Sequence, residues 1–256
     1  MELTLENKTF PTIARYIIPF LIIILWHFIY LLLGEPAMAS PWQSFLSLKE
    51  NSLNWLSDIW ITLITLFISF IIAAVSGTII GFLIGLSPFW SEVLNPIIIS
   101  IYSIPKITLY PVFLLIFGLT VEGRIAFSVF HAIFPIIILS IGAIRTIPEV
   151  YFKVANIYKL SFLQKARLII IPAIRPQLVV GYRMGFNLAF LGLILAEMFA
   201  SFEGLGSRLV HYMSLNRPES ILAIICIIIF IALFITFLFL LWQERIESKI
   251  GKIKNI

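Results

Sequence analysis

The sequence predicts an all-α integral membrane protein of about six transmembrane helices, forming a single domain over residues 1–256. Hydrophobic residues make up 61% of the chain and charged residues 12%, against roughly 45–50% and about 25% in a soluble domain. The mean hydropathy is +1.06. Apolar stretches long enough to cross the hydrocarbon core of a bilayer, about 20 residues, recur along the chain. Lipid is therefore the expected solvent.

Six stretches meet this length requirement, and they cover residues 14–33, 58–86, 93–119, 124–144, 177–200 and 221–242. The second is long enough to cross the bilayer with tilt. The segment 145–176, between the fourth and fifth spans, is the most charged internal part of the chain.

Small residues recur every four positions in the second span, at Ala73, Gly77, Gly81 and Gly85. Such a stripe allows another helix to approach closely. We expect a packing surface here; a sliding surface in a gating motion is the weaker alternative.

The third span has an irregular middle, because Pro105 and Pro111 each remove a backbone donor and Lys106 lies between them. A break of this kind is tolerated where neighbouring helices or a cavity satisfy the freed carbonyls. A simple kink and a break that lines a pathway both remain open.

The distribution of Lys and Arg predicts the orientation, because positive residues in short loops stay on the cytoplasmic side. Six spans leave only Lys49, Arg124, Arg208 and Arg217 on one side. The other side receives Lys8, Arg15, Arg145, Lys153, Lys159, Lys165, Arg167, Arg175, Arg245, Lys249, Lys252 and Lys254. Both termini and the segment 145–176 are therefore expected in the cytoplasm. The net charge of +5 reflects this topology, and no nucleic-acid partner is expected.

The segment 145–176 predicts two short helices. Val150, Val154, Ile157 and Ser161 fall on one face of the first.

Ser161 has the side chain to cap the second short helix. Leu163, Ala166 and Ile170 share an apolar face of that helix, and Pro172 is expected to end it before the fifth span. From the residues alone, a partner's docking site and an amphipathic segment on anionic lipid are equally good interpretations.

No pattern for catalysis or metal binding appears. The sequence lacks a G-x-x-x-x-G-K-[ST] phosphate loop and a Gly-x-Ser-x-Gly elbow. His27, His131 and His211 share no ligand spacing, and Cys226 lies in an apolar run where packing is its expected role. Arg183 lies near the inner end of the fifth span and Glu197 near its outer end. Two ionisable residues at opposite ends of a span are weak evidence for a proton relay. Energy for active transport is therefore expected from a partner rather than from an ion gradient.

The segment 145–176 resembles the cytoplasmic signature of binding-protein-dependent ABC importer permeases. The family pattern is Glu-Ala-Ala, three residues, Gly, nine residues, Ile, two residues, Pro. On this chain it begins at Lys153-Val154-Ala155, places Lys159 at the glycine and ends with Ile169 and Pro172. Lys153 and Lys159 depart from the pattern, and a lysine that keeps the left-handed turn of the glycine costs about 1 kcal/mol.

Other stretches resemble the nitrate, sulfonate, taurine and bicarbonate class of these permeases, and the resemblance covers about residues 39–242. The matching pieces are Ser40-Pro41, the Gly77–Gly81–Gly85 helix, Ile104-Pro105-Lys106, Pro111 with Phe117-Gly118, Phe134-Pro135, Ala196-Glu197-Met198 and Gly204-Leu205-Gly206.

The resemblance implies a type I importer permease subunit in a bacterial or archaeal plasma (inner) membrane. Two copies, expected to be identical, would surround the pathway. Two ATP-binding cassette subunits would use ATP and Mg, and an extracytoplasmic binding protein would deliver the substrate. The chain itself would bind no cofactor directly and would catalyse no reaction.

The resemblance also implies roles for particular residues. The expected contacts with the ATPase subunit are Ala155, Asn156, Lys159, Leu160 and Ser161, with Leu160 as an apolar knob. The pathway or gate candidates are Pro105, Lys106, Pro111, Arg183, Glu197, Gly204 and Gly206.

The substrate is the least determined feature. A small anion such as a sulfonate or nitrate is favoured, since Lys106 and Arg183 would suit a negative charge. A pyrimidine precursor of thiamine, or another heterocycle, is the alternative within the family. Outside it, an ion-coupled secondary transporter is the second hypothesis and a channel the third.

Overall fold

The computed structural model describes residues 9–35 and 37–254, and the side chains of residues 17–35 and 37–248. Lys8 and the side chains of Arg15, Lys249, Lys252 and Lys254, which the topology argument used, lie outside these ranges. The helices are α1 (Thr9–Leu33), α2 (Pro41–Gly85), α3 (Pro88–Ser103), the 3-10 turn η1 (Lys106–Leu109), α4 (Tyr110–Phe117), α5 (Val121–Arg145), α6 (Glu149–Ile157), α7 (Phe162–Lys165), the π-helical turn η2 (Ala166–Ile170), α8 (Ile171–Ala200), α9 (Leu205–Ser214) and α10 (Pro218–Lys254). The described residues contain no strand.

The number of spans is the part of the prediction that the structure leaves open. Four helical stretches are long and apolar enough to cross a membrane: Pro41–Gly85, Val121–Arg145, Phe162–Ala200 and Pro218–Ser248. The pair α3 and η1–α4 would be a fifth span if counted as one. The part of α1 whose side chains are described, Ile17–Leu33, is a shorter apolar helix. The all-helical membrane fold is confirmed, and the count of six stays a prediction.

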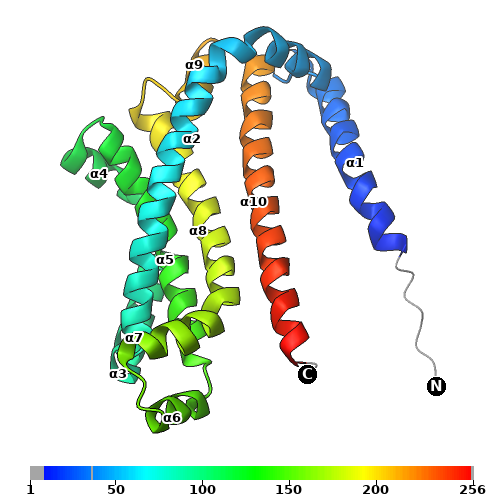
Figure 1. The fold of residues 1–256 in the computed structure, drawn as a ribbon. Helices are drawn as coiled ribbons and strands as arrows, with labels where there is room; N and C mark the ends of the chain where they lie inside the picture. Colours follow the sequence, from blue (N-terminus) through cyan, green and yellow to red (C-terminus); the bar gives the residue numbers. More distant parts are fainter. Residues whose placement is uncertain (1–8, 36, 255–256) are drawn as a thin grey trace.

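Helix α2, which contains the second predicted span, is much longer than that span. Helix α2 begins at Pro41, rather than at residue 58, because Ser40 and Gln43 form a reciprocal capping box around the first turn and Pro41 occupies a position that needs no backbone donor. Figure 1 shows α2 running from the end of the molecule that holds α9 to the end that holds α3 and α7.

The expected stripe of small residues packs directly on α5, which lies between α2 and α8. A Cβ added to Gly81 would lie 2.5 Å from Cβ of Ser140 and 2.9 Å from the carbonyl oxygen of Ile137. On the other flank, a Cβ added to Gly185 of α8 would lie 2.7 Å from Cδ1 of Ile136. Glycines on both neighbours therefore let the two helices close on α5, and the expected packing surface is confirmed.

The third predicted span is broken rather than continuous. Helix α3 ends at Ser103, and the helical segment Lys106–Phe117 follows at an angle of 86°. Pro105 precedes η1, while Pro111 lies in the first turn of α4, where a missing backbone donor costs nothing. Pro105 therefore marks the break, whereas Pro111 is compatible with the helix that it begins.

The expected stop at Pro172 is wrong. Residues 162–200 form one helical stretch, counted as a single span. The π-helical turn Ala166–Ile170 closes with a bond from the Ile171 N–H to the carbonyl of Ala166. This turn leads directly into α8, whose second residue is Pro172, so the helix continues past the proline. The fifth span consequently begins before residue 177.

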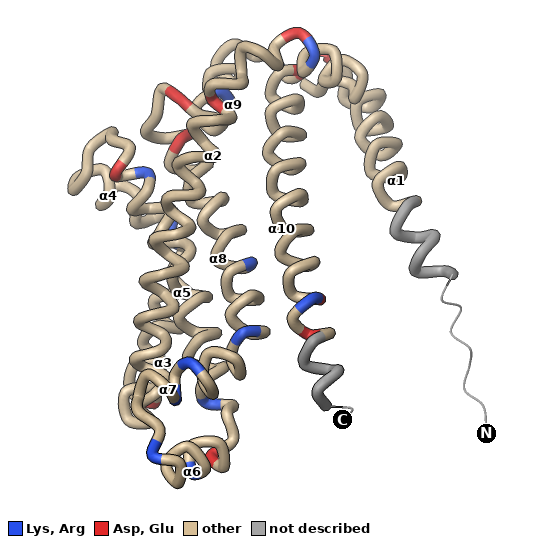
Figure 2. The backbone as a smooth tube through the Cα atoms, in the orientation of Figure 1, with Lys and Arg blue, Asp and Glu red and all other residues tan. Residues whose placement is uncertain are grey.

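Charges separate along the molecule. In Figure 2, Lys and Arg gather around α6 and α7, and most of the Asp and Glu lie toward the other end, near α9 and the start of α2. Helix α1 leads toward the α9 end, and α10 runs from that end back toward the end of α6. The two ends are called below the α9 end and the α6 end.

Candidate functional site

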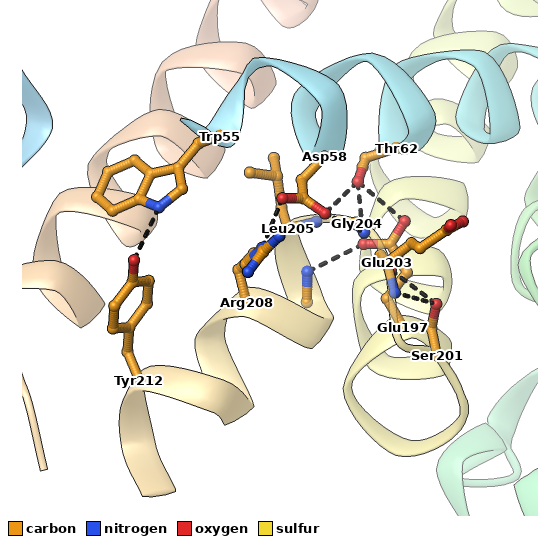
Figure 3. Close-up of polar contacts among 11 residues, drawn as sticks. Trp55, Asp58, Thr62, Glu197, Ser201, Glu203, Gly204, Leu205, Arg208 and Tyr212 are labelled. Carbon is orange, nitrogen blue, oxygen red and sulfur yellow. Dashed lines mark hydrogen bonds and ion pairs between the residues drawn. The ribbon is translucent and has the colours of Figure 1, made fainter. Parts of the chain in front are cut away.

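Three helices meet in a buried polar cluster at the α9 end (Figure 3). Asp58 and Thr62 lie one turn apart on α2, and Glu197 lies in the last turn of α8. Asp58, Thr62 and Glu197 are all buried, and Glu197 has no exposed surface at all. A short loop then leads to Gly204, which precedes the first residue of α9.

The cluster satisfies three N–H groups at the N-terminus of α9, where the N-cap residue, Gly204, has no side chain to cap the helix. Gly204 donates to Oδ1 of Asp58, Leu205 to Oγ1 of Thr62 and Gly206 to Oε2 of Glu197, each at 2.9 Å. Two carboxylates at a helix N-terminus also interact favourably with the helix dipole. Helix α9 is thereby tied to both α2 and α8.

The Thr62 hydroxyl links these bonds into one network. Its oxygen accepts the Leu205 N–H, and its proton is donated to the Glu197 carboxylate at 2.9 and 3.0 Å. A hydroxyl has one proton to donate and lone pairs that accept. The Thr62 hydroxyl therefore donates toward Glu197 and accepts from Leu205.

The glycines of this segment are required by space. Gly204 has φ of +92°, and a Cβ there would lie 2.5 Å from the Glu197 carboxyl carbon. A Cβ on Gly206 would collide with the carbonyl oxygen of Ile194 and lie 2.7 Å from Cβ of Glu197. The structure thus brings together Glu197, Gly204 and Gly206, three of the residues that the resemblance named as pathway or gate candidates.

Two arginines complete the cluster. Nε of Arg208, on α9, lies 2.6 Å from Oδ2 of Asp58. Arg124, on α5, is 5% exposed and donates to the Ser201 hydroxyl at 2.7 Å. The Arg208–Asp58 pair joins α9 to α2, and the Arg124–Ser201 bond joins the loop before α9 to α5. Chemically, the cluster fixes helices in place and presents no paired nucleophile and base.

Sequence reasoning missed Asp58, Thr62 and Arg208. Asp58 was treated as the edge of a span, and Arg208 was counted only as an outer loop charge. The available signal was an acid and a hydroxyl four residues apart at the start of an apolar run, since an ionisable group inside a helix bundle needs a partner.

At the α6 end, the turn after α6 has the geometry of the family's glycine. Lys159 has φ of +52°, its N–H donates to the Asn156 carbonyl at 3.0 Å and the Leu160 N–H donates to the Ala155 carbonyl at 2.9 Å. These two bonds form a Schellman motif with Lys159 in the left-handed position. The lysine therefore adopts the turn at a cost in strain.

The residues expected to contact an ATPase subunit differ in exposure. Asn156, Lys159 and Ser161 are exposed, Leu160 is half-buried, and Ala155 has no exposed surface. The Ala155 methyl group is turned into the chain and packs there, and its contact with an ATPase subunit stays a prediction.

The exposed apolar surface of this turn is formed by Ile157 and Tyr158, which are 77% and 75% exposed. Val150 and Val154 lie on the same outward face, as predicted, and are also exposed. Leu160 is the smaller knob because it belongs to the turn that closes α6. We define the inner apolar surface as Val150, Val154, Ile157 and Tyr158.

A second contact orients α6 against the following helix. Nζ of Lys165 donates to Oδ1 of Asn156 at 2.7 Å. The Ser161 hydroxyl accepts from the Gln164 N–H at 3.3 Å, confirming the predicted cap of the second helix. Ala166 and Ile170 of that helix are buried as expected, whereas Leu163 is exposed.

The two basic candidates within the spans have different surroundings. Nζ of Lys106 donates to the carbonyl of Tyr102 at 2.9 Å and lies 4.3 Å from the centroid of the Tyr102 ring. It therefore satisfies the end of α3 at the break. Arg183 is half-buried on α8 and lies apart from the α9-end cluster. Within the described residues, no group of three or more His, Cys, Asp or Glu could hold a metal ion.

Comparison with known proteins identifies the family. Residues 77–252 match the family model described as "Binding-protein-dependent transport system inner membrane component". The putative aliphatic sulfonates transport permease protein SsuC of Bacillus subtilis is 27% identical over 221 residues, covering 85% of this chain and 80% of the relative. The nitrate import permease protein NrtB of Synechococcus elongatus is 29% identical over 194 residues, covering 71% of this chain and 70% of the relative.

A further relative is a transport permease, and one solved structure shares the fold. The taurine transport system permease protein TauC of Escherichia coli is 25% identical over 183 residues, covering 71% of this chain and 66% of the relative. A chain of the MetNI methionine ABC transporter, solved in inward-facing conformations, shares the fold with a TM-score of 0.62 and 18% identity, covering 77% of this chain and 97% of that one. Members of this family are transport components rather than enzymes. This chain belongs to the binding-protein-dependent inner membrane transport components and is a multi-pass permease of the ABC importer type.

Proposed function

We propose that two copies of this chain form the pathway of an ATP-driven importer for a small oxyanion, such as a sulfonate or nitrate. Two ATP-binding cassette subunits bind at the α6 end, and an extracytoplasmic protein delivers the substrate to the α9 end. The family implies ATPase and binding-protein partners in general, and relatives are named for sulfonates, nitrate and taurine.

The observation that carries this proposal is the inner apolar surface. Ile157 and Tyr158 are largely exposed on a short helix, outside the stretches long enough to cross a membrane. The Schellman turn and the Lys165–Asn156 bond hold that helix in one orientation. An exposed apolar patch on a rigid element is typical of a protein–protein interface. Asn156, Lys159, Leu160 and Ser161 border it and are the proposed coupling residues.

Transport follows from unequal binding to two states. Closure of the ATPase subunits around ATP and Mg moves the two copies of α6, and the attached spans change from inward-open to outward-open. The permease transmits this change, because a ligand shifts an equilibrium only through its different affinity for the two states. At the other end, Glu197, Gly204 and Gly206 hold α9 over the mouth, and the break at Pro105 and Lys106 beside Pro111 is a further pathway candidate.

The test is reconstitution of this chain with the ATPase subunit and the binding protein that are encoded beside it. We expect the ATPase subunit to co-purify at equal stoichiometry and substrate uptake into proteoliposomes to require ATP. Uptake that persists with an ATPase subunit unable to hydrolyse ATP would favour an ion-coupled secondary transporter instead.

Orientation has its own test in intact cells. In a background with Cys226→Ala, single cysteines are placed at Tyr158, in the inner apolar surface, and at Phe202, in the exposed loop before α9. A membrane-impermeant maleimide should label position 202 and spare position 158. Labelling of position 158 from outside would remove the proposed contact with the ATPase subunit.

A further inference from the structure

Arg183 lies much deeper in the bundle than the sequence suggested. The two glycines that flank it pack on the middle of α5: a Cβ on Gly181 would lie 3.6 Å from Cα of Ile136, and one on Gly185 would lie 2.7 Å from Cδ1 of the same residue. Ile136 is about 13 Å along the helix axis from Arg145, the last residue of α5. Because α8 begins at Ile171, before residue 177, Arg183 lies further from the start of its helix than the predicted span implied.

Among the side chains that the structure describes, no carboxylate pairs with the guanidinium of Arg183. The ion pairs of the described chain join Arg145 to Glu92, Lys153 to Glu149 and Arg208 to Asp58. The sequence contains no Asp or Glu between Val150 and Ala196. An ionisable group within a span normally faces a partner or a water-filled cavity, because lipid solvates charge poorly.

The neighbour of Arg183 on α8 adds further donors. Asn187 lies one helical turn along, is exposed, and accepts a hydrogen bond at Oδ1 from the Thr236 hydroxyl of α10 at 3.0 Å. That bond occupies the amide oxygen and leaves the amide NH2 group as a donor. Arg183 and Asn187 together therefore offer donors and a positive charge, which is the chemistry that an oxyanion requires.

This face of α8 contrasts with the other uncovered faces of the bundle. The outward face of α10 is apolar, with Phe230, Leu233 and Phe237 exposed, as lipid requires. The uncovered face of α8 places Asn187 between Met184 and Leu191, beside Arg183.

Lys106 lies at a similar depth, with Nζ 5.6 Å from the centroid of the Phe134 ring of α5. Its ammonium group is already bonded to the end of α3. Arg183 is thus the basic side chain at this depth that has no such role in the fold.

We propose that Arg183 and Asn187 form an oxyanion-binding site at mid-depth in the pathway, and that this site selects anionic substrates during transit. The inference rests on the proposed function, since it needs the uncovered face of α8 to line the pathway between two copies. Its ligand is a small sulfonate, nitrate or carboxylate-like anion, held by the planar fork of the guanidinium and by the amide.

The experiment uses the complete complex in proteoliposomes and four labelled probes: ethanesulfonate, taurine, nitrate and bicarbonate. We expect the wild type to take up at least one of them. R183Q should lower that uptake about tenfold or more, because it removes hydrogen bonds from a charged donor. R183K should retain part of the uptake, since it keeps the charge but loses the fork, and N187L should fall between the wild type and R183Q.

The matched control is R175Q, which removes the same charge from an exposed position on the same helix. Its uptake should stay within about twofold of the wild type, and co-purification of the ATPase subunit shows that each variant has folded. Wild-type uptake that R183Q leaves unchanged would overturn the site and leave the importer function intact. ATP hydrolysis by the wild type without uptake of any of the four anions would overturn the oxyanion substrate and the site together.

A lipid phosphate is the other source of the same chemistry. Each variant is therefore measured in phosphatidylglycerol-containing vesicles and in phosphatidylcholine vesicles. A transport site predicts the R183Q loss in both. A loss confined to the anionic vesicles would assign Arg183 to a lipid headgroup and overturn the substrate site.

Discussion

The short helices at the two ends of the molecule, α9 and α6, are held in place in different ways. Helix α9, at one end, has its first three N–H groups bonded to Asp58, Thr62 and Glu197 from two other helices of the same chain. Helix α6, at the other end, closes on itself through the Lys159 turn and leaves Ile157 and Tyr158 exposed. One helix is held by its own chain, and the other is rigid but uncovered.

This difference indicates where each end gains its stability. Buried polar groups are costly unless every donor and acceptor is paired, so the α9 end depends on several residues at once. The α6 end contains few buried polar groups, and its exposed apolar surface can contact another protein. We therefore expect substitutions at the α9 end to act on stability, and substitutions on the inner apolar surface to act on coupling.

The largest effect is expected from Ile157→Asp. A carboxylate at the centre of an apolar contact is costly to bury unpaired, so ATP hydrolysis stimulated by the binding protein should be lost. Because Ile157 is exposed, the melting temperature should not change. Ile157→Leu, which keeps an apolar side chain of the same size at this position, is the control and should retain stimulation. Normal stimulation in Ile157→Asp would remove the inner apolar surface from the coupling mechanism.

Glu197→Ala should destabilise the α9 end. It leaves the Gly206 N–H and the Thr62 hydroxyl without their acceptor, at about 1–3 kcal/mol for each unsatisfied group. Thermal unfolding in detergent, followed by tryptophan fluorescence, measures the loss. Glu203→Ala, which removes an exposed carboxylate in the adjacent loop, should stay within about 0.5 kcal/mol of the wild type. Equal effects of the two variants would contradict the cluster.

Gly81→Ala probes the seam that connects the two ends. Its new methyl group would collide with Ser140 and the Ile137 carbonyl, at a cost of about 1–3 kcal/mol. Gly142→Ala is the matched control, because a Cβ there meets nothing within 4 Å, and alanine favours the helix by up to about 1 kcal/mol. Opposite signs in the melting temperature are expected, and a loss in both variants would count against the seam.

The smallest effect is a gain at the α6 end. Lys159→Gly removes the strain of a left-handed lysine and should stabilise the turn by about 1 kcal/mol. Slower hydrogen exchange of the Leu160 amide, which closes the turn on Ala155, measures this locally. Lys159→Ala keeps the strained backbone and should give no protection; a gain in that variant would show that the lysine charge, rather than φ, sets the cost.

Local patterns predicted the features that depend on neighbours in sequence. The spacing from Lys153 to Pro172 located the segment that resembles the family's cytoplasmic signature, Ser161 predicted a cap that the structure contains, and Gly81 predicted a close helix contact that α5 supplies. The stop at Pro172 was wrong because a π-helical turn immediately before the proline continues the helix into α8. Leu163 is exposed although it was grouped with the buried Ala166 and Ile170, because helical period alone does not tell which residues another helix covers.

The sequence by itself determined the class of solvent and the helical backbone, since composition and short-range spacing decide these. That Lys159 keeps the left-handed turn was shown by the structure. Only the tertiary structure decided that Asp58 and Thr62 meet Glu197 beneath α9, because those contacts join residues more than 130 positions apart. It also set the depth of Arg183, which depends on where α8 begins and on which turn of α5 its glycines contact. Hydrogen bonds and close packing act over a few ångströms in space, and the chain's path through the bundle fixes which side chains come within that range.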